Sequence, residues 1–76
     1  MANLRLLSYL ASALDATAAD VAAVLELSLP AAGMLLLRAT RGGLVGRIWD
    51  ADQQCFLYGL TEKGRARITF FERRAH

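Results

Sequence analysis

The sequence predicts a small α+β fold, mainly helical, in which two helices joined by a tight corner are followed by a β-hairpin and a final helix. Two patterns support this fold class. Apolar residues recur with the helical period of about 3.6 residues as far as Gly43, and alternate as in a strand after it. Hydroxyl residues that cap helices precede three of the expected helices, and the Gly42-Gly43 pair stands where one of them must end.

The length of 76 residues leaves room for one domain, and we expect a single domain over residues 1–76. A fold this small buries little surface, yet 55% of its residues are hydrophobic, above the usual fraction of about 45–50%. Lone Cys55 excludes an intrachain disulfide, and Cys55 with His76 cannot form a structural zinc site. We therefore expect a partner to cover part of the apolar surface, and we expect neither a metal nor a cofactor.

Composition also restricts the class of function. The sequence contains no nucleophile motif, no glycine-rich phosphate loop after a strand and no pair of carboxylates spaced beyond chance, so we expect no enzyme. No segment resembles a targeting signal, and no apolar run approaches the ~20 residues that span a bilayer, so we expect a soluble, cytoplasmic protein. The net charge of +2 and the pI of about 9.2 favour nucleic acid as a partner, but only weakly.

The first helix is expected over residues 4–14, with Asn3 as its N-cap. Leucines at helical spacing form one apolar face, and Leu6 and Tyr9 lie outside it. A helix that is apolar on more than one side is either central in its fold or packed against another chain. In so short a sequence we favour the second explanation for Leu6 and Tyr9.

A helix-turn-helix is expected next. Thr17 and Asp20 have the spacing of a capping box, which starts a helix over 18–25. Its inward face is predicted to hold Val21, Val24 and Leu25. After a corner at 26–28, Ser28 caps a second helix over 29–41, in which Pro30 occupies the first turn. Its inward positions are Ala32, Leu35, Leu36 and Ala39, which leaves Met34 and Leu37 pointing outward.

A β-hairpin is expected over residues 44–60, with a polar loop at 50–54. Alternation places Phe56, Tyr58 and Leu60 toward the helices, and Cys55 and Leu57 on the other face. We expect Trp49 to pack within the hairpin rather than to serve as a base-stacking platform, and we expect the acidic tip to be a solvated turn. Thr61 then caps a last helix over 62–74, in which Ile68 and Phe71 pack inward and Phe70 does not.

This order of elements is that of a winged helix-turn-helix, a three-helix core with a β-hairpin wing and a C-terminal helix. The sequence resembles the MarR and PadR groups of bacterial transcriptional regulators over about residues 17–67. The most specific match is the Leu60-Thr61-Glu62-Lys63-Gly64 block after an aromatic strand. The resemblance implies a dimeric regulator that binds double-stranded DNA, with the second helix of the motif in the major groove and the wing near the minor groove. Leu6, Tyr9 and Phe70 are the predicted dimer contacts.

The resemblance also implies a DNA surface. Arg38, Arg41 and Arg47 match positions that approach phosphates, and Ser28 matches a residue at a helix start whose N–H groups do likewise. A merely solvated helix face is the alternative for the three arginines. The base-facing positions 29–31, 33, 34 and 37 carry no side chain that can hydrogen-bond a base edge. Gln53 and Gln54 stand where the wing usually carries arginine, between acidic residues, and Glu26 replaces a common turn glycine. The predicted DNA-binding residues are Ser28, Ala31, Met34, Arg38, Arg41, Arg47, Gln53 and Gln54.

A second function class stays open. The apolar outward face of 29–41, with Met34 and Leu37 at its centre, also suits a winged helix that docks a protein partner. Between the two we favour the DNA-binding regulator, with contacts made mainly from arginine to phosphate.

Overall fold

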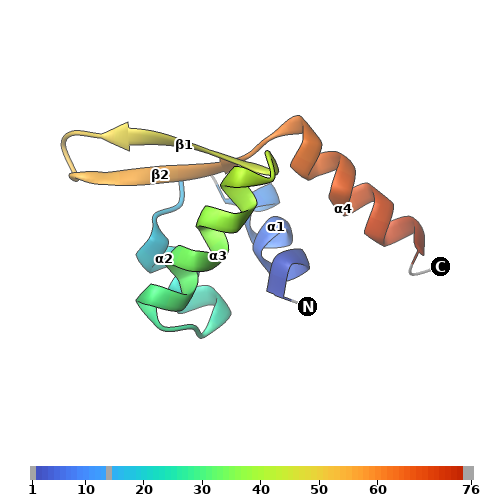
Figure 1. Ribbon diagram of the computed structural model, residues 1–76, viewed down its shortest axis with the longest axis horizontal. Coiled ribbons are helices and arrows are strands. Elements are labelled where there is room, and N and C mark those ends of the chain that lie inside the picture. Colours follow the sequence, from blue (N-terminus) through green and yellow to red (C-terminus); the bar gives the residue numbers. More distant parts are fainter. Residues whose placement is uncertain (1, 14, 75–76) are drawn as a thin grey trace.

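The computed structural model describes residues 2–13 and 15–74, and this part of the chain forms four helices and one antiparallel two-stranded sheet. The elements are α1 (Ala2–Ser12), α2 (Ala18–Leu25), α3 (Leu29–Arg41), β1 (Val45–Asp50), β2 (Cys55–Leu60) and α4 (Glu62–Arg74). Helices α1, α2 and α3 gather on one side of the hairpin, while the hairpin and α4 extend toward opposite ends of the molecule (Figure 1). The molecule is accordingly elongated, at 42 × 24 × 21 Å.

The predicted bounds of α2, α3 and α4 are confirmed, and those of α1 are wrong. Helix α1 begins at Ala2, so Asn3 lies inside the helix and is not its N-cap. The helix ends at Ser12, and Leu14, the predicted last residue, lies outside the described residues, as does His76. The chain is then drawn into extended pairing, in which the Ala16 and Tyr58 N–H groups each donate to the other's carbonyl (N···O 3.3 and 2.7 Å). This pairing partner is remote in sequence, so no local pattern predicts it.

Local capping explains why α2 and α3 begin where they do. The Asp20 N–H donates to Thr17 Oγ1 (3.1 Å) and the Thr17 N–H donates to the Asp20 carboxylate (3.0 Å), which is the predicted capping box. The Ala31 N–H donates to Ser28 Oγ (3.2 Å), so Ser28 is the predicted N-cap of α3. Between the two helices, Glu26 adopts a φ of 56°, in the left-handed region that glycine occupies most easily.

The core lies between α1, α2, α3 and the base of the hairpin, and it corrects two predictions. Leu6 is fully buried, because α1 contacts α2, α3, α4 and β2 and therefore has more than one covered side. Val24 is 48% exposed, since the neighbours of α2 cover only the side with Val21 and Leu25. The buried hydrophobic residues are Leu6, Leu7, Leu10, Ala16, Val21, Leu25, Ala32, Leu36, Ala39 and Val45.

The hairpin has a register in which Val45 faces Leu60, Arg47 faces Tyr58 and Trp49 faces Phe56. Tyr58 and Leu60 pack against the core as predicted. The connecting turn has four residues rather than the expected five, because Asp50 pairs with Cys55 and belongs to β1.

The Leu-Thr-Glu-Lys-Gly block has a structural explanation at the junction of α3, β1 and α4. Thr61 Oγ1 accepts from the Gly64 N–H (3.1 Å) and donates to the Gly43 carbonyl (2.6 Å), while the Thr61 N–H donates to the Leu44 carbonyl (3.1 Å). Gly43 has a φ of 78°, which ends α3. Thr61 is therefore both the predicted cap of α4 and a tie to the end of α3.

In the described part of the chain, no single helix is long and apolar enough to cross a membrane. Helices α2 and α3 reach the required length and apolar content only when they are counted together, and they are bent by 110° relative to each other.

Candidate nucleic-acid interface

Helix α3 separates its residues into a buried side and an exposed side. Ala32, Leu36 and Ala39 are buried in the core, and half-buried Leu35 packs against them. The exposed side follows the helical spacing of three and four residues, so its members form one continuous stripe. We call this stripe the α3 face, and it consists of Ser28, Ala31, Met34, Arg38 and Arg41. Five of the eight predicted DNA-binding residues therefore lie together on one surface.

The chemistry of the α3 face changes along its length. Arg38 and Arg41 occupy the last turn of the helix and are exposed. Met34, at the middle, is 51% exposed, as predicted. Leu37 was also predicted to point outward, but it is half-buried. At the start of α3, Pro30 has no N–H and the Ala31 N–H already donates to Ser28 Oγ. The groups that could bind an anion are therefore the arginines at the C-terminal end of the face, rather than the backbone N–H groups at the helix N-terminus.

Arg47 extends from β1 and is held against an aromatic ring. Its guanidinium carbon lies 4.1 Å from the centroid of the Phe56 ring, a cation–π contact. Trp49 packs edge-on against the same ring, with centroids 5.1 Å apart and an interplanar angle of 75°. Trp49 nevertheless remains 55% exposed, so the expectation that it packs within the hairpin holds for only part of its surface.

Gln53 and Gln54 lie in the turn at the wing tip, and both are exposed. The Gln53 amide nitrogen donates to the Asp50 carboxylate (3.0 Å), which also accepts from the Asp52 N–H (2.9 Å). Gln54 has a φ of 54°, which lets the short turn close. The tip is thus organised by its own hydrogen bonds.

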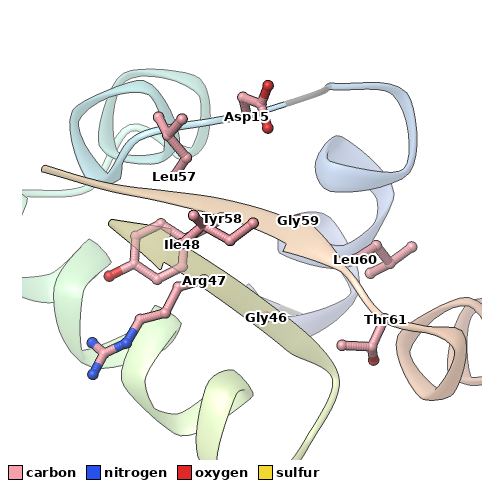
Figure 2. A pocket seen from close by; sticks show the side chains of 9 residues that line it. All are labelled: Asp15, Gly46, Arg47, Ile48, Leu57, Tyr58, Gly59, Leu60 and Thr61. Atoms are coloured by element: carbon pink, nitrogen blue, oxygen red, sulfur yellow. The ribbon is translucent and has the colours of Figure 1, made fainter. Parts of the chain in front are cut away.

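The hairpin also carries a shallow hollow of about 290 Å³, lined by residues of both strands (Figure 2). Gly46 and Gly59 face each other across the strands along it, and Ile48 and Leu57 stand beside them. Its polar residues are Asp15, Arg47, Tyr58 and Thr61, of which the Thr61 hydroxyl is already hydrogen-bonded within the fold. The hollow is therefore largely apolar and open.

The contact of Arg47 and Trp49 with Phe56 was not predicted from the sequence. Once the pairing of Trp49 with Phe56 is known, alternation places all three side chains on one face. The signal was present in the two aromatic strands, but it depended on the register, which the length of the turn determines.

Comparisons with known proteins give the fold a family context. No family model and no curated protein matches the sequence. Solved structures do match. A complex of Staphylococcus aureus MepR with DNA has a TM-score of 0.86 and 27% identity, over 95% of this chain and 60% of that one. A MarR-family transcription regulator has a TM-score of 0.88 and 25% identity, over 99% and 50%. Streptococcus pneumoniae FabT in complex with DNA has a TM-score of 0.84 and 22% identity, over 96% and 52%.

The chain thus spans 50–60% of the length of these proteins. The match includes all the elements named above, because at least 95% of this chain is covered in each case. The PadR resemblance stays a prediction. The resemblance to MarR regulators is confirmed, and the fold of this chain is the winged helix of MarR-family transcription regulators.

Proposed function

We propose that this chain is a DNA-binding transcription regulator module that binds double-stranded DNA as a homodimer, mainly through contacts from arginine to phosphate. The observation that carries the proposal is the α3 face, a continuous exposed stripe that ends in Arg38 and Arg41. The structural likeness to MepR supports it, since MepR has been solved in complex with DNA. We further propose that residues 1–76 act as one domain, because α1, α2, α3 and β1 contribute to one buried cluster.

The chemistry of the α3 face favours weak dependence on base sequence. Ala31 and Met34 lie where a helix in the major groove would meet base edges, and neither side chain offers a base edge a strong donor or acceptor. Arg38, Arg41 and Arg47 are exposed and carry charges that phosphates attract. The proposed regulator therefore binds duplex DNA with an affinity that depends strongly on salt and little on sequence.

A salt titration tests this proposal. The affinity for a fluorescently labelled random duplex is measured by anisotropy at several salt concentrations, for the parent and for the double variant Arg38→Ala with Arg41→Ala. Each lost phosphate contact reduces the slope of log K against log salt by about 0.9. The double variant loses two contacts in each subunit of the proposed dimer, so its slope should fall by about 3.6. The matched control is Arg5→Ala with Arg65→Ala, which removes the same charge from exposed positions on α1 and α4, outside α3. Equal losses in the two variants would show that only net charge matters.

The proposed dimer uses the outer side of α4. Leu6, one of its predicted contacts, is unavailable because it is buried, and Tyr9 is half-buried against the core. Phe70 is 51% exposed, and its neighbour Ala66 on the same helix face is also exposed. Exposed apolar area of this kind is typical of surfaces that another chain covers.

A further inference from the structure

Three side chains on one face of the hairpin form a contiguous cluster, which we call the wing stack: Arg47, Phe56 and Trp49. Phe56 is the centre, with the guanidinium of Arg47 over its face at 4.1 Å and the indole of Trp49 against it at 5.1 Å. The cluster continues toward the core through Tyr58, whose ring centroid is 6.4 Å from that of Phe56. The wing stack is thus anchored at its base and open at its outer end.

Folding alone does not account for the wing stack. None of its three members belongs to the buried core or to the partly buried hydrophobic residues packed against that core. Trp49 is 55% exposed and Arg47 is exposed. A large aromatic side chain that is left in water beside a fixed cation is typical of a binding surface, because both groups gain by contact with a ligand that is apolar and anionic at once.

The tip of the wing has fewer groups that could bind such a ligand. The Asp50 carboxylate lies on the other face of the strand from Trp49, and two hydrogen bonds direct it into the turn. One of these bonds also occupies the amide nitrogen of Gln53. The charge of Asp52, which is exposed, repels phosphates. The cationic and aromatic surface of the wing therefore lies along its strands, behind an acidic turn.

We infer that the wing stack, rather than Gln53 and Gln54 at the tip, is the contact of the wing with double-stranded DNA. This inference rests on the proposed function. The Phe56 ring holds the Arg47 guanidinium in place, so its N–H groups can reach phosphate oxygens or the acceptors in the minor groove. The exposed indole of Trp49 lies against deoxyribose and base edges, where apolar side chains are used by proteins that contact the minor groove. Duplex DNA supplies both the negative charge and the flat apolar surface that the stack fits.

Trp49 is the only tryptophan of the chain, so its fluorescence reports directly on the wing stack. A labelled duplex is titrated with the parent protein at low salt, and binding is followed by the anisotropy of the label. Tryptophan emission and its quenching by acrylamide are followed in the same titration. We expect the emission to change, and the accessibility to acrylamide to fall at least twofold, with the midpoint that anisotropy gives.

Variants supply the second measurement. Trp49→Ala should weaken duplex binding about tenfold, the order of magnitude for losing one aromatic contact with a nucleic acid. Ile48→Ala is the matched control, because Ile48 neighbours Trp49, is 73% exposed and points to the other face of β1. Its affinity should stay within about twofold of the parent. Arg47→Lys keeps the charge but loses the flat guanidinium, and it should weaken binding while leaving the salt slope unchanged.

The failures can be told apart. If anisotropy reports binding and the Trp49 signal does not move, the wing stack is not at the DNA and the inference is wrong, while the proposed function stands. An equal loss in Ile48→Ala and Trp49→Ala also overturns it. If the parent binds no duplex at low salt, the proposed function and the inference fail together. A Trp49 signal that follows protein concentration without DNA would assign the stack to a second copy of the chain, and tighter protection by single-stranded DNA would overturn the duplex assignment.

Discussion

At Gly64, helix α4 passes next to the turn that follows α3. A Cβ built on this residue would overlap the Leu44 carbonyl oxygen and would lie 2.7 Å from Leu60 Cδ1. Backbone cannot yield as a flexible side chain can, so we expect Gly64→Ala to lower the free energy of unfolding by about 2–3 kcal/mol. Urea denaturation followed by circular dichroism measures the change.

Gly33 provides the control for that substitution. It lies inside α3, and a Cβ at this position would meet no atom within 4 Å. Gly33→Ala should therefore raise the stability by about 1 kcal/mol, through helix propensity and a less flexible unfolded chain. Should both alanines change the stability in the same direction, crowding at Gly64 would not be the cause.

Glu26 occupies a backbone conformation that disfavours its own side chain. Its φ of 56° lies in the left-handed region, which costs a residue with a Cβ roughly 1–2 kcal/mol. We expect Glu26→Gly to raise the free energy of unfolding by about 0.5–1 kcal/mol, since the greater freedom of glycine in the unfolded chain offsets part of the gain. Glu26→Ala keeps the strain and removes the charge, so a similar gain from alanine would refute the conformational explanation.

Residue burial was predictable where the rest of the fold covers a single side of a helix. On α3 three of the four expected inward residues, Ala32, Leu36 and Ala39, are buried, and the fourth, Leu35, is half-buried. Leu6 was predicted to face outward because a helical pattern shows the faces of a helix but not how many neighbours it has. Val24 was wrongly predicted to be buried for a similar reason. Helical spacing places Val24 beside Val21 and Leu25, but it does not show how much of that side of α2 the neighbouring elements cover.

Among the elements, those whose ends depend on adjacent residues were predictable. Thr17, Ser28 and Thr61 each accept from an N–H three residues later, so the start of each helix was present in the sequence. The end of α1 depends instead on the pairing of Ala16 with Tyr58, which brings together distant parts of the chain. The prediction failed at α1, where the expected N-cap Asn3 lies inside the helix.

Substitutions on the outward side of α3 distinguish DNA binding from protein docking. Met34→Ser with Leu37→Ser should leave the affinity for duplex DNA within about threefold of the parent, because these side chains can at best meet a thymine methyl group. On a protein-docking surface the same change would remove anchors, and truncating an anchor commonly costs ~2 kcal/mol or more. Anisotropy with labelled duplex measures the affinity. Because Leu37 is half-buried, Met34→Ser alone is the control for stability, with folding checked by circular dichroism.

At the scale of the whole molecule, the proposed homodimer makes a direct prediction. Static light scattering at micromolar concentration should give about twice the chain mass of 8.3 kDa. Phe70→Ser should shift the protein toward the monomer, because it removes the exposed aromatic ring from α4. Thr69→Ser, at the adjacent exposed position, should leave the mass unchanged. A parent mass of 8.3 kDa would contradict the proposed dimer.

The candidate site, like the fold, was predictable where it depends on residues that are close in sequence. The α3 face follows from helical spacing alone, and its five residues lie together in the structure. The wing stack needs the register of β1 against β2, a relation between two segments, so Trp49 was assigned to packing. The opposite directions of the hairpin and α4 are a property of the assembled molecule and had no sequence signal (Figure 1).

The two hydrogen bonds of the Thr61 hydroxyl join the start of α4 to the end of α3, so a tilt of α4 about this point moves its far end most. One hydroxyl links the Gly43 carbonyl, just beyond α3, to the first turn of α4. With 13 residues, α4 is about 20 Å long, so a tilt of about 10° about this point moves its far end by about 3 Å. In the proposed dimer, where Phe70 lies near that far end, such a tilt would change the distance between the two α3 helices, and with it their match to the spacing of successive turns of the DNA groove.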